Sequence, residues 1–429
     1  MGRSHWRIGV AGVGTVGAGL IKVVTTRPRF SPTGDLCTVT GVSARSRTAR
    51  RPIDISAFAW FDDPVALASS PDNDIFVELM GGADGPAKAA VEAALRLGKP
   101  VVTANKALIA AHGRELAALA EAHRAPLLFE AAVMGGTPAV KVLREAMVGD
   151  DILAVAGILN GTCNYILSQM EATGCNFTEV LGEAQALGYA EADPTTDVGG
   201  FDAGHKISIL AALAFGKAPT LSVAKIEGVD TIELLDIRLA KDLGYRIKLI
   251  ASAAVENGAV SVRVHPALIP LEHPLARVDG ALNALFIHGA TIGRIFIQGA
   301  GAGAGPTAAA VAADIADVMT GAVRPVFQRP AVDLESISAV SPDAATGRVY
   351  VRLLVKDEPG VIASISETLA EAGVSIDSFL QKPIEGAGGV PIVLTTHLAP
   401  EATIAKAVRA MAALSTLIAP PRVIRIAHI

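Results

Sequence analysis

The residues best suited to chemistry in this sequence are a carboxylate and an amine four positions apart, Asp202 and Lys206. Residues four apart on a helix lie on one face, so the two side chains would meet one turn apart. The following residues, 207–215, are mostly apolar and predict a buried helix, which would turn the pair inward. An ammonium held beside a carboxylate there can exchange a proton with a substrate hydroxyl. The alternative interpretation of the same spacing is a salt bridge on an ordinary helix.

A glycine-rich turn near the N-terminus indicates a nucleotide site. Gly12, Gly14 and Gly17 form the pattern G-x-G-x-x-G, with Thr15 and Val16 between the last two glycines. The pattern follows a predicted strand and opens a predicted helix, which is the context that a dinucleotide site requires. Its glycines would let a pyrophosphate approach the helix N-terminus closely.

The residues after the second predicted strand, 36–43, suggest which dinucleotide binds. Sites for NAD place Asp or Glu there to bind the ribose hydroxyls, but this chain has Arg45 and Arg47. Two guanidinium groups suit a 2′-phosphate, so NADP is favoured and NAD is the alternative. A solvated loop containing Arg50 and Arg51 as well is the other interpretation of this basic cluster.

Two further segments lie just before predicted helices, a position where parallel sheets often bind ligands. Thr103 ends the predicted strand 99–103, and Lys106 opens the next helix, so Lys106 could touch phosphate, nicotinamide or substrate. A lysine with no role at a helix start is the alternative. The glycine-rich run 299–305 before Pro306 is either a flexible linker or a turn that approaches a ligand.

Cys163 offers a rival chemistry. It lies where a predicted strand, 152–159, gives way to a helix. A thiol at a helix N-terminus can act as a nucleophile, which would make the protein a thiol-dependent aldehyde dehydrogenase. A packed structural cysteine is the other interpretation of Cys163.

The elements that must position these residues predict an α/β fold, a Rossmann-type doubly wound parallel sheet. Apolar strands separated by helices are typical of such a sheet. Strands are expected at 7–11, 36–43, 75–80, 99–103 and 127–130, and helices at 15–24, 86–97 and 106–123.

The remaining sequence divides into further parts. After the nucleotide-binding domain at 1–135, longer helices and fewer strands predict an α+β substrate and dimerisation domain over 136–333. The helix at about 306–325 is expected to pack back on the first domain. A linker rich in Ser, Pro, Asp and Gly follows at 334–347, and the order βαββαβ over 348–429 predicts a ferredoxin-like domain.

Composition narrows the function classes. The chain has 429 residues, of which 51% are hydrophobic and 18% charged, and a net charge of −5 gives no reason to expect nucleic acid as a partner. Three scattered cysteines imply no disulfide framework and fit a cytoplasmic protein. No uninterrupted apolar run reaches the roughly 18 residues that cross a bilayer, so no membrane partner is expected. The histidines form no ligand cluster, and His265 and His273, each before a proline, are expected in loops.

Together these motifs resemble homoserine dehydrogenase of the monofunctional bacterial type. The segments that carry the resemblance are 12–17, 103–106, 130–138, 157–167, 188–194, the pair Asp202 and Lys206, and 299–307. The segment 353–361 is similar to the start of an ACT domain, a fold that senses amino acids.

The resemblance implies reversible reduction of L-aspartate 4-semialdehyde to L-homoserine by NAD(P)H, in threonine, methionine and isoleucine biosynthesis. Lys206 would be the general acid, and Asp202 would bind substrate and orient Lys206. The further substrate residues would be Lys106, Tyr189, Glu191 and Asp197, and the further cofactor residues Lys106, Gly161 and Gly305.

The resemblance also implies a sodium ion, an effector and an oligomer. The sodium site would use Glu130, Val133, Gly135 and Thr137, largely through backbone carbonyls. L-threonine would bind the turn at 357–360, whereas a purely oligomerising domain is the alternative. A homodimer or homotetramer is expected, and a non-catalytic sensor of NADP and amino acids is the rival from another class.

Overall fold

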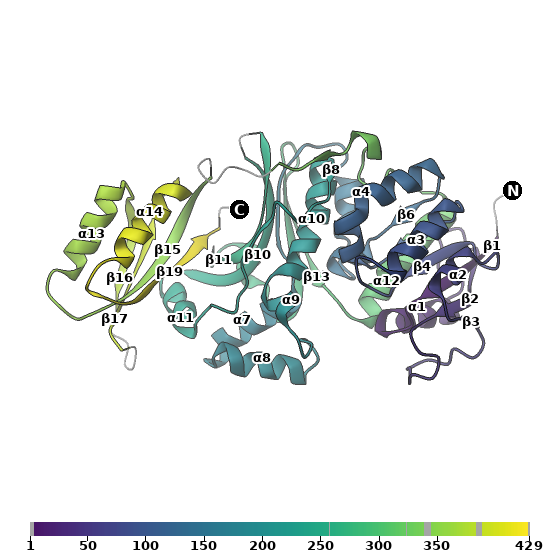
Figure 1. The fold of residues 1–429 in the computed structure, drawn as a ribbon, viewed down its shortest axis with the longest axis horizontal. Coiled ribbons are helices and arrows are strands. Elements are labelled where there is room, and N and C mark those ends of the chain that lie inside the picture. Colours follow the sequence, from purple (N-terminus) through teal and green to yellow (C-terminus); the bar gives the residue numbers. More distant parts are fainter. Residues whose placement is uncertain (1–3, 257, 323, 339–344, 383–387, 428–429) are drawn as a thin grey trace.

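The computed structural model describes residues 4–427 apart from 257, 323, 339–344 and 383–387. Its three parts lie in a row, with the N-terminal domain at one end, the C-terminal domain at the other and a mixed domain between them (Figure 1). None of the helices in these described residues is both long and apolar enough to cross a membrane.

The N-terminal domain has the predicted doubly wound sheet. Its described strands pair in parallel in the order β3-β2-β1-β4-β5-β6. The strands are β1 His5–Ala11, β2 Leu36–Ser43, β3 Ala59–Phe61, β4 Ile75–Glu78, β5 Val101–Thr103 and β6 Leu127–Leu128. The helices are α1 Thr15–Thr26, α2 Pro64–Ser69, α3 Pro86–Arg96 and α4 Lys106–Ala122.

Side chains of these strands point alternately to the two faces of the sheet and form an apolar layer on each. Ile8 and Val10 pack with α1 on one face, whereas Phe76 and Val101 pack with α2, α3 and α4 on the other. A late helix, α12 (Ala304–Thr320), completes the first layer beside α1, as Figure 1 also shows. The doubly wound fold predicted from the sequence is therefore confirmed.

The middle domain is built on an antiparallel sheet in the order β13-β12-β7-β10-β11. The strands are β7 Ile152–Ile158, β10 Tyr245–Glu256, β11 Ala259–Pro270, β12 Leu282–Gly289 and β13 Gly293–Ala300. The helices are α7 Gly161–Thr173, α8 Phe177–Ala186, α9 Thr195–Val198, α10 Phe201–Phe215 and α11 Leu234–Asp242. Because α7, α10 and α11 all pack on these strands, they form one layer over the sheet.

Shorter elements lie between and within these domains. They are α5 Ala131–Met134, α6 Ala139–Lys141, a π-helical turn at Val142–Ala146, β8 Lys217–Ala218, β9 Lys225–Ile226 and 3₁₀ turns at Pro274–Arg277 and Ala331–Asp333. β14 (Glu335–Ser336) pairs with β8, so the first residues of the predicted linker form a short strand. Residues 339–344 of that linker lie outside the described residues.

The expectation that His265 lies in a loop is wrong, because His265 is a buried residue of β11. Proline usually argues against a strand since it lacks an N–H group. On one side β11 pairs with β9 only as far as Val264 and with β19 (Leu417–Ile426) only from Ala267, and Pro266 lies in the gap between these two short pairings. No ladder bond is required of it there, so the strand continues through the proline.

The C-terminal domain has the predicted βαββαβ order. Its strands are β15 Thr346–Val355, β16 Ile376–Gln381, β17 Val390–Thr396 and β19 Leu417–Ile426, with a short β18 at Ala399–Pro400, and its helices are α13 Val361–Ala372 and α14 Glu401–Ala412. The strands pair in the order β19-β15-β17-β16, and both helices pack on one face around a separate apolar core.

Two contacts join this domain to the middle one. β19 pairs in parallel with β11, so the two sheets are continuous. The guanidinium of Arg352 on β15 contacts the fully buried Asp236 of α11 at 2.7 Å, and the Tyr350 hydroxyl donates to the same carboxylate at 3.2 Å. The C-terminal domain is therefore seated on the middle domain by backbone pairing and by a buried ion pair.

Candidate active site

The predicted Asp–Lys pair forms, and a second lysine joins it from another domain. The Asp202 carboxylate lies 2.7 Å from the Lys206 ammonium through Oδ2 and 3.0 Å from the Lys106 ammonium through Oδ1. Burial would raise the pKa of Asp202, but the two ammonium groups outweigh it and hold this pKa well below its ordinary value. The same carboxylate raises the pKa of Lys106. One ionised carboxylate thus joins α4 of the nucleotide domain to α10 of the middle domain.

The end of β7 fixes the Lys206 ammonium from the other side. Lys206 Nζ donates to the Leu159 carbonyl at 2.7 Å, and this carbonyl also accepts an N–H from the Asn283 amide at 3.0 Å. Of the three N–H groups of an ammonium, the described residues Leu159 and Asp202 take two. The third is left for a substrate oxygen, so the geometry suits proton transfer from Lys206.

The other predicted substrate residues surround this pair less tightly. Asp197 is half-buried on α9, and its carboxylate accepts an N–H from Asn160 at 2.8 Å. Tyr189 and Glu191 are exposed on the segment before α9, and the Tyr189 ring packs on Tyr165 at 4.8 Å. The carboxylates of Asp202, Asp197 and Glu191 all raise the pKa of Lys106, so this acidic surrounding could attract a substrate ammonium.

The glycine turn has the shape of a phosphate cradle. Gly12 has φ +97°, and a Cβ on Gly17 would lie 2.0 Å from the Gly12 carbonyl oxygen, so only glycine fits at the start of α1. A Cβ on Gly14 would meet open space, and no side chain of the described residues caps α1. The first N–H groups of α1 therefore remain available for a pyrophosphate.

The remaining cofactor candidates lie in different surroundings. Arg45 and Arg47 are exposed just past the carboxyl end of β2. The Thr103 hydroxyl donates to the buried Glu78 carboxylate at 2.6 Å, so this side chain is engaged within the sheet. Gly305 lies in the first turn of α12, which begins at Ala304 rather than after Gly305.

In the predicted cation loop, Gly135 packs tightly against another backbone segment, and the Glu130 carboxylate accepts backbone N–H groups. Gly135 has φ +54°, and a Cβ there would lie 2.5 Å from the Gly301 carbonyl oxygen. The Glu130 carboxylate accepts N–H groups of Val140 at 3.1 Å and Lys141 at 2.7 Å.

Side chains of this loop are therefore engaged elsewhere, and the Thr137 hydroxyl donates to the Ala300 carbonyl at 3.4 Å. Within the described residues, no group of three or more His, Cys, Asp or Glu side chains could hold a metal ion. A cation here would have to use the backbone carbonyls of Glu130, Val133, Gly135 and Thr137.

Comparisons with known proteins agree over the whole length of the chain. A family described as homoserine dehydrogenase matches residues 138–316, its NAD-binding domain matches 12–130, and the ACT domain matches 349–415. Homoserine dehydrogenase of Neisseria gonorrhoeae is 41% identical to this chain over 97% of the chain and 98% of the relative. The chain belongs to the homoserine dehydrogenase family.

Other members of the homoserine dehydrogenase family support this assignment. The enzyme of Pseudomonas aeruginosa is 40% identical over 98% of both chains. A crystal structure of a homoserine dehydrogenase from Thiobacillus denitrificans superposes with a TM-score of 0.90 at 38% identity and covers 99% of each chain. A hyperthermophilic archaeal homoserine dehydrogenase mutant, solved in complex with NADPH, is 27% identical with a TM-score of 0.64 and covers 74% of this chain and 98% of its own.

Family membership confirms the resemblance noted in the sequence. The protein is a homoserine dehydrogenase, an oxidoreductase with a domain for a nicotinamide cofactor, a domain for a small-molecule substrate and a C-terminal ACT domain. The roles of individual residues stay predictions.

The surroundings of the Cys163 thiol do not suit the nucleophile of a thiol-dependent aldehyde dehydrogenase. It is fully buried and donates to the Asp197 carbonyl at 3.2 Å. Burial raises its pKa well above the ordinary value, and the nearby Asp197 and Asp202 carboxylates add to this rise. A reactive cysteine needs the opposite shift, so the geometry favours a structural role for Cys163.

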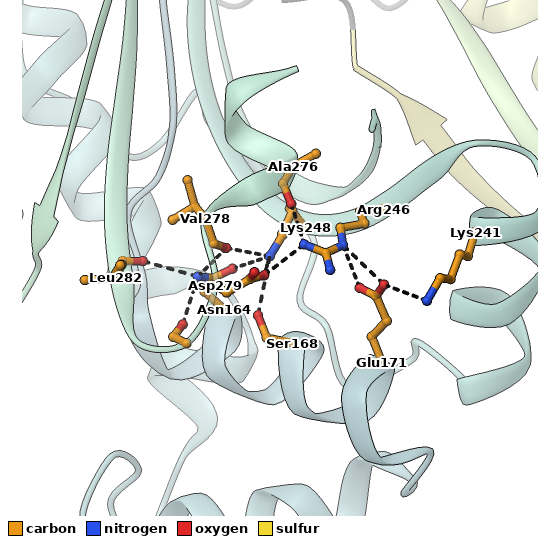
Figure 2. A network of polar contacts seen from close by, with 11 residues as sticks. Asn164, Ser168, Glu171, Lys241, Arg246, Lys248, Ala276, Val278, Asp279 and Leu282 are labelled. Carbon is orange, nitrogen blue, oxygen red and sulfur yellow. Dashed lines mark hydrogen bonds and ion pairs between the residues drawn. The ribbon is translucent and has the colours of Figure 1, made fainter. Parts of the chain in front are cut away.

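A buried lysine that the sequence analysis missed, Lys248, fixes a backbone turn that packs against α7. The Lys248 ammonium donates to the Val278 carbonyl at 2.6 Å and to the Asn164 side-chain oxygen at 3.0 Å (Figure 2). The Asn164 amide in turn donates to the carbonyls of Val278, Gly280 and Leu282. The turn 278–282 is thereby fixed through its backbone.

This turn bears directly on the active site. Gly161, the first residue of α7, approaches it so closely that a Cβ would lie 2.6 Å from the Ala281 carbonyl oxygen. The turn also delivers Asn283 to the Leu159 carbonyl behind Lys206. No local pattern in the sequence could reveal this, because residues 30 to 124 positions apart form it.

The burial of Lys248 should make stability depend on pH. Burial lowers its pKa from 10.5 to about 8, although the Asp279 carboxylate opposes this shift. Between these two pKa values the unfolded chain binds the proton more tightly than the folded one, so the free energy of unfolding should rise with pH across that window. The rise should amount to at most about 3 kcal/mol.

Denaturant unfolding of the wild type and of Lys248→Met at several pH values measures this effect. The wild type should gain stability relative to Lys248→Met as the pH increases from about 8 to about 10.5. Lys241→Met, a change at a lysine of the same network that is 63% exposed, serves as the control and should show no such trend. A pH-independent difference between the wild type and Lys248→Met would contradict the assignment.

Proposed function

We propose that this protein catalyses the reversible, NADP-dependent reduction of L-aspartate 4-semialdehyde to L-homoserine in the cytoplasm. The observation that carries the proposal is the buried Asp202 carboxylate, which holds two ammonium groups where the nucleotide and substrate domains meet. Family membership supports the reaction, and the Gly12–Gly17 turn supplies an anion site for the cofactor pyrophosphate.

The residues have distinct tasks in this reaction. The bound nicotinamide supplies the hydride to the aldehyde carbon. Lys206 donates a proton to the aldehyde oxygen as negative charge develops there, and Asp202 keeps the ammonium aimed at that atom. Asp197 and Glu191 attract the substrate ammonium, while Lys106 contributes a second positive charge near the reacting oxygen.

Replacement of Lys206 tests the proton-transfer role. Lys206→Ala should lower kcat by roughly 10²–10⁴-fold, because it removes a positioned proton donor. The affinity for NADPH, measured by fluorescence titration, should stay close to that of the wild type. Cys163→Ala should retain turnover, which separates this mechanism from that of a thiol-dependent aldehyde dehydrogenase. Near-normal kcat in Lys206→Ala would refute the assignment.

We further propose that NADP is preferred over NAD, and this rests on Arg45 and Arg47. Both are exposed past β2, where they can approach a 2′-phosphate, and the neighbouring Arg51 is engaged with backbone carbonyls of its own loop.

Replacing both arginines with alanine should raise the KM for NADP by roughly tenfold or more and leave that for NAD nearly unchanged, because charge-assisted contacts with the phosphate are lost. Arg96→Ala, at an arginine of α3 that is 61% exposed, is the control for a general loss of positive charge. Equal changes in both KM values would show that the cluster is only a solvated loop.

We propose that the loop 130–137 binds sodium through backbone carbonyls, as hard cations prefer oxygen ligands. Exchange of sodium for tetramethylammonium at constant ionic strength should lower the thermal unfolding temperature and the activity. Thr137→Val should keep this response, because it leaves the carbonyl in place. An enzyme that responds only to ionic strength would exclude the site.

We propose that the ACT domain binds L-threonine at the turn before α13 and thereby inhibits the enzyme. A cavity of about 330 Å³ lies there, lined by residues 355–363 with Gln381 and Ile392. Gly360 has φ +89° and precedes α13, whose first turn no described side chain caps. A carboxylate would be stabilised by these N–H groups and by the positive end of the helix.

A pair of variants at Gly360 separates binding from strain. Gly360→Asp should reduce inhibition by threonine strongly, because it places a like charge at the carboxylate site. Gly360→Ala causes the same backbone strain at this positive φ but adds no charge, so this variant should retain more of the inhibition. Inhibition is read from initial rates at increasing threonine.

Substitutions are preferable to removal of the ACT domain. Truncation would also remove β19 from the edge of β11 and leave the buried Asp236 without Arg352. An enzyme insensitive to millimolar threonine, isoleucine and methionine would favour a purely oligomerising role of the ACT domain.

We propose that the protein forms a homodimer or a homotetramer, two states that light scattering distinguishes by mass.

A further inference from the structure

Asn160 lies between the last residue of β7 and the first residue of α7, and it is almost fully buried. Its side-chain oxygen accepts the backbone N–H of Cys163 at 2.8 Å and so caps α7. Its amide nitrogen donates to Asp197 Oδ1 at 2.8 Å and to Asp202 Oδ2 at 2.9 Å. One carboxamide therefore caps a helix and bridges two acidic side chains.

The residue type matches these tasks. Ser, Thr and Asp can also cap a helix, but only a carboxamide offers an acceptor together with two N–H donors at the end of a short side chain. Helix capping alone would thus not require asparagine at position 160.

The carboxylates that Asn160 bridges belong to one charged cluster. Asp197 interacts with Asp202 and Lys206 of α10 and with Lys106 of α4, while α7 brings Asn160 and the Cys163 thiol against it. Asp230, on the segment 228–230 that packs against Val198 and Gly199, is the further acidic group near this thiol.

Two of these influences oppose ionisation of Asp197 and three favour it. Burial raises its pKa and so does the Asp202 carboxylate, whereas the N–H of Asn160 and the two ammonium groups lower it. The net pKa lies above the ordinary value of an aspartate. The hydrogen bond from Asn160 is therefore a contact on which the charge of Asp197 depends.

We propose that Asn160 is a positioning residue of this reaction: its two N–H groups hold Asp197 and Asp202 side by side as carboxylates and thereby set the lowest pH at which substrate is bound productively. The proposal rests on the proposed function, in which these carboxylates receive the substrate ammonium and orient Lys206.

Asn160→Ser is the informative variant. Serine keeps a capping oxygen for α7 but cannot bridge the two carboxylates. The acid limb of the kcat/KM profile for L-homoserine, which reports ionisation in the free enzyme, should move to higher pH by about one unit. Asn160→Asp, which keeps the size and the capping oxygen but adds a third carboxylate, should move the limb at least as far.

Asn176→Ala is the matched control. Asn176 caps α8 through the backbone N–H of Glu179 at 3.0 Å, in the same way as Asn160 caps α7, but its side chain lies outside the carboxylate cluster. The control should lower thermal stability and leave the acid limb at its wild-type position. An unmoved limb in both Asn160 variants would overturn the proposal and reduce Asn160 to a helix cap.

Failure of the two proposals is distinguishable. A wild-type enzyme that does not oxidise L-homoserine would refute the proposed function. The ionisation of Asp197 can then be followed by ¹³C NMR of enzyme labelled at aspartate carboxyls, with Asp197→Asn for assignment. A higher pKa of Asp197 in Asn160→Ser than in the wild type would still support the role of Asn160, and an equal pKa would exclude it.

Discussion

The active site depends on one buried carboxylate that must remain charged. Removal of an isolated carboxylate from water costs several kcal/mol, so it has to be compensated by charges and hydrogen bonds at close range. Asp202 obtains this compensation from Lys106 of the nucleotide domain, Lys206 of its own helix and the amide of Asn160. Because these partners come from three elements, satisfying the charge also fixes how α4, α7 and α10 meet.

A second buried carboxylate has the same effect where the middle domain meets the C-terminal domain. Asp236 on α11 is paired with Arg352 of the ACT domain, beside the parallel pairing of β19 with β11. α11 packs on α7, whose first turn is capped by Asn160 next to Asp202. A continuous set of packed elements therefore joins the ACT domain to the carboxylate cluster, and an effector that inhibits through this domain must bind one arrangement of these elements more tightly than another.

What the sequence predicts well is local. The spacing of Asp202 and Lys206 on one helix, the glycine turn at residues 12–17 and the βαββαβ order depend on neighbours along the chain, and the structure contains all of them. The bridging amide of Asn160 and the ammonium of Lys248 depend on partners 30 to 84 positions away, so periodicity could not reveal them. The side chain of Glu130 likewise accepts backbone N–H groups of α6, a contact that the resemblance, which implied a cation loop of backbone carbonyls here, did not predict.

The central claim is that the Asp202 carboxylate organises an oxidoreductase site for L-homoserine. The most direct test is the rate at which NADPH forms from NADP and L-homoserine, compared between the wild type and Asp202→Asn. The account predicts homoserine-dependent NADPH formation by the wild type and a loss of about a hundredfold or more in kcat/KM in the variant, with NADPH still bound. No homoserine-dependent reduction by the wild type, or equal rates in the two proteins, would contradict it.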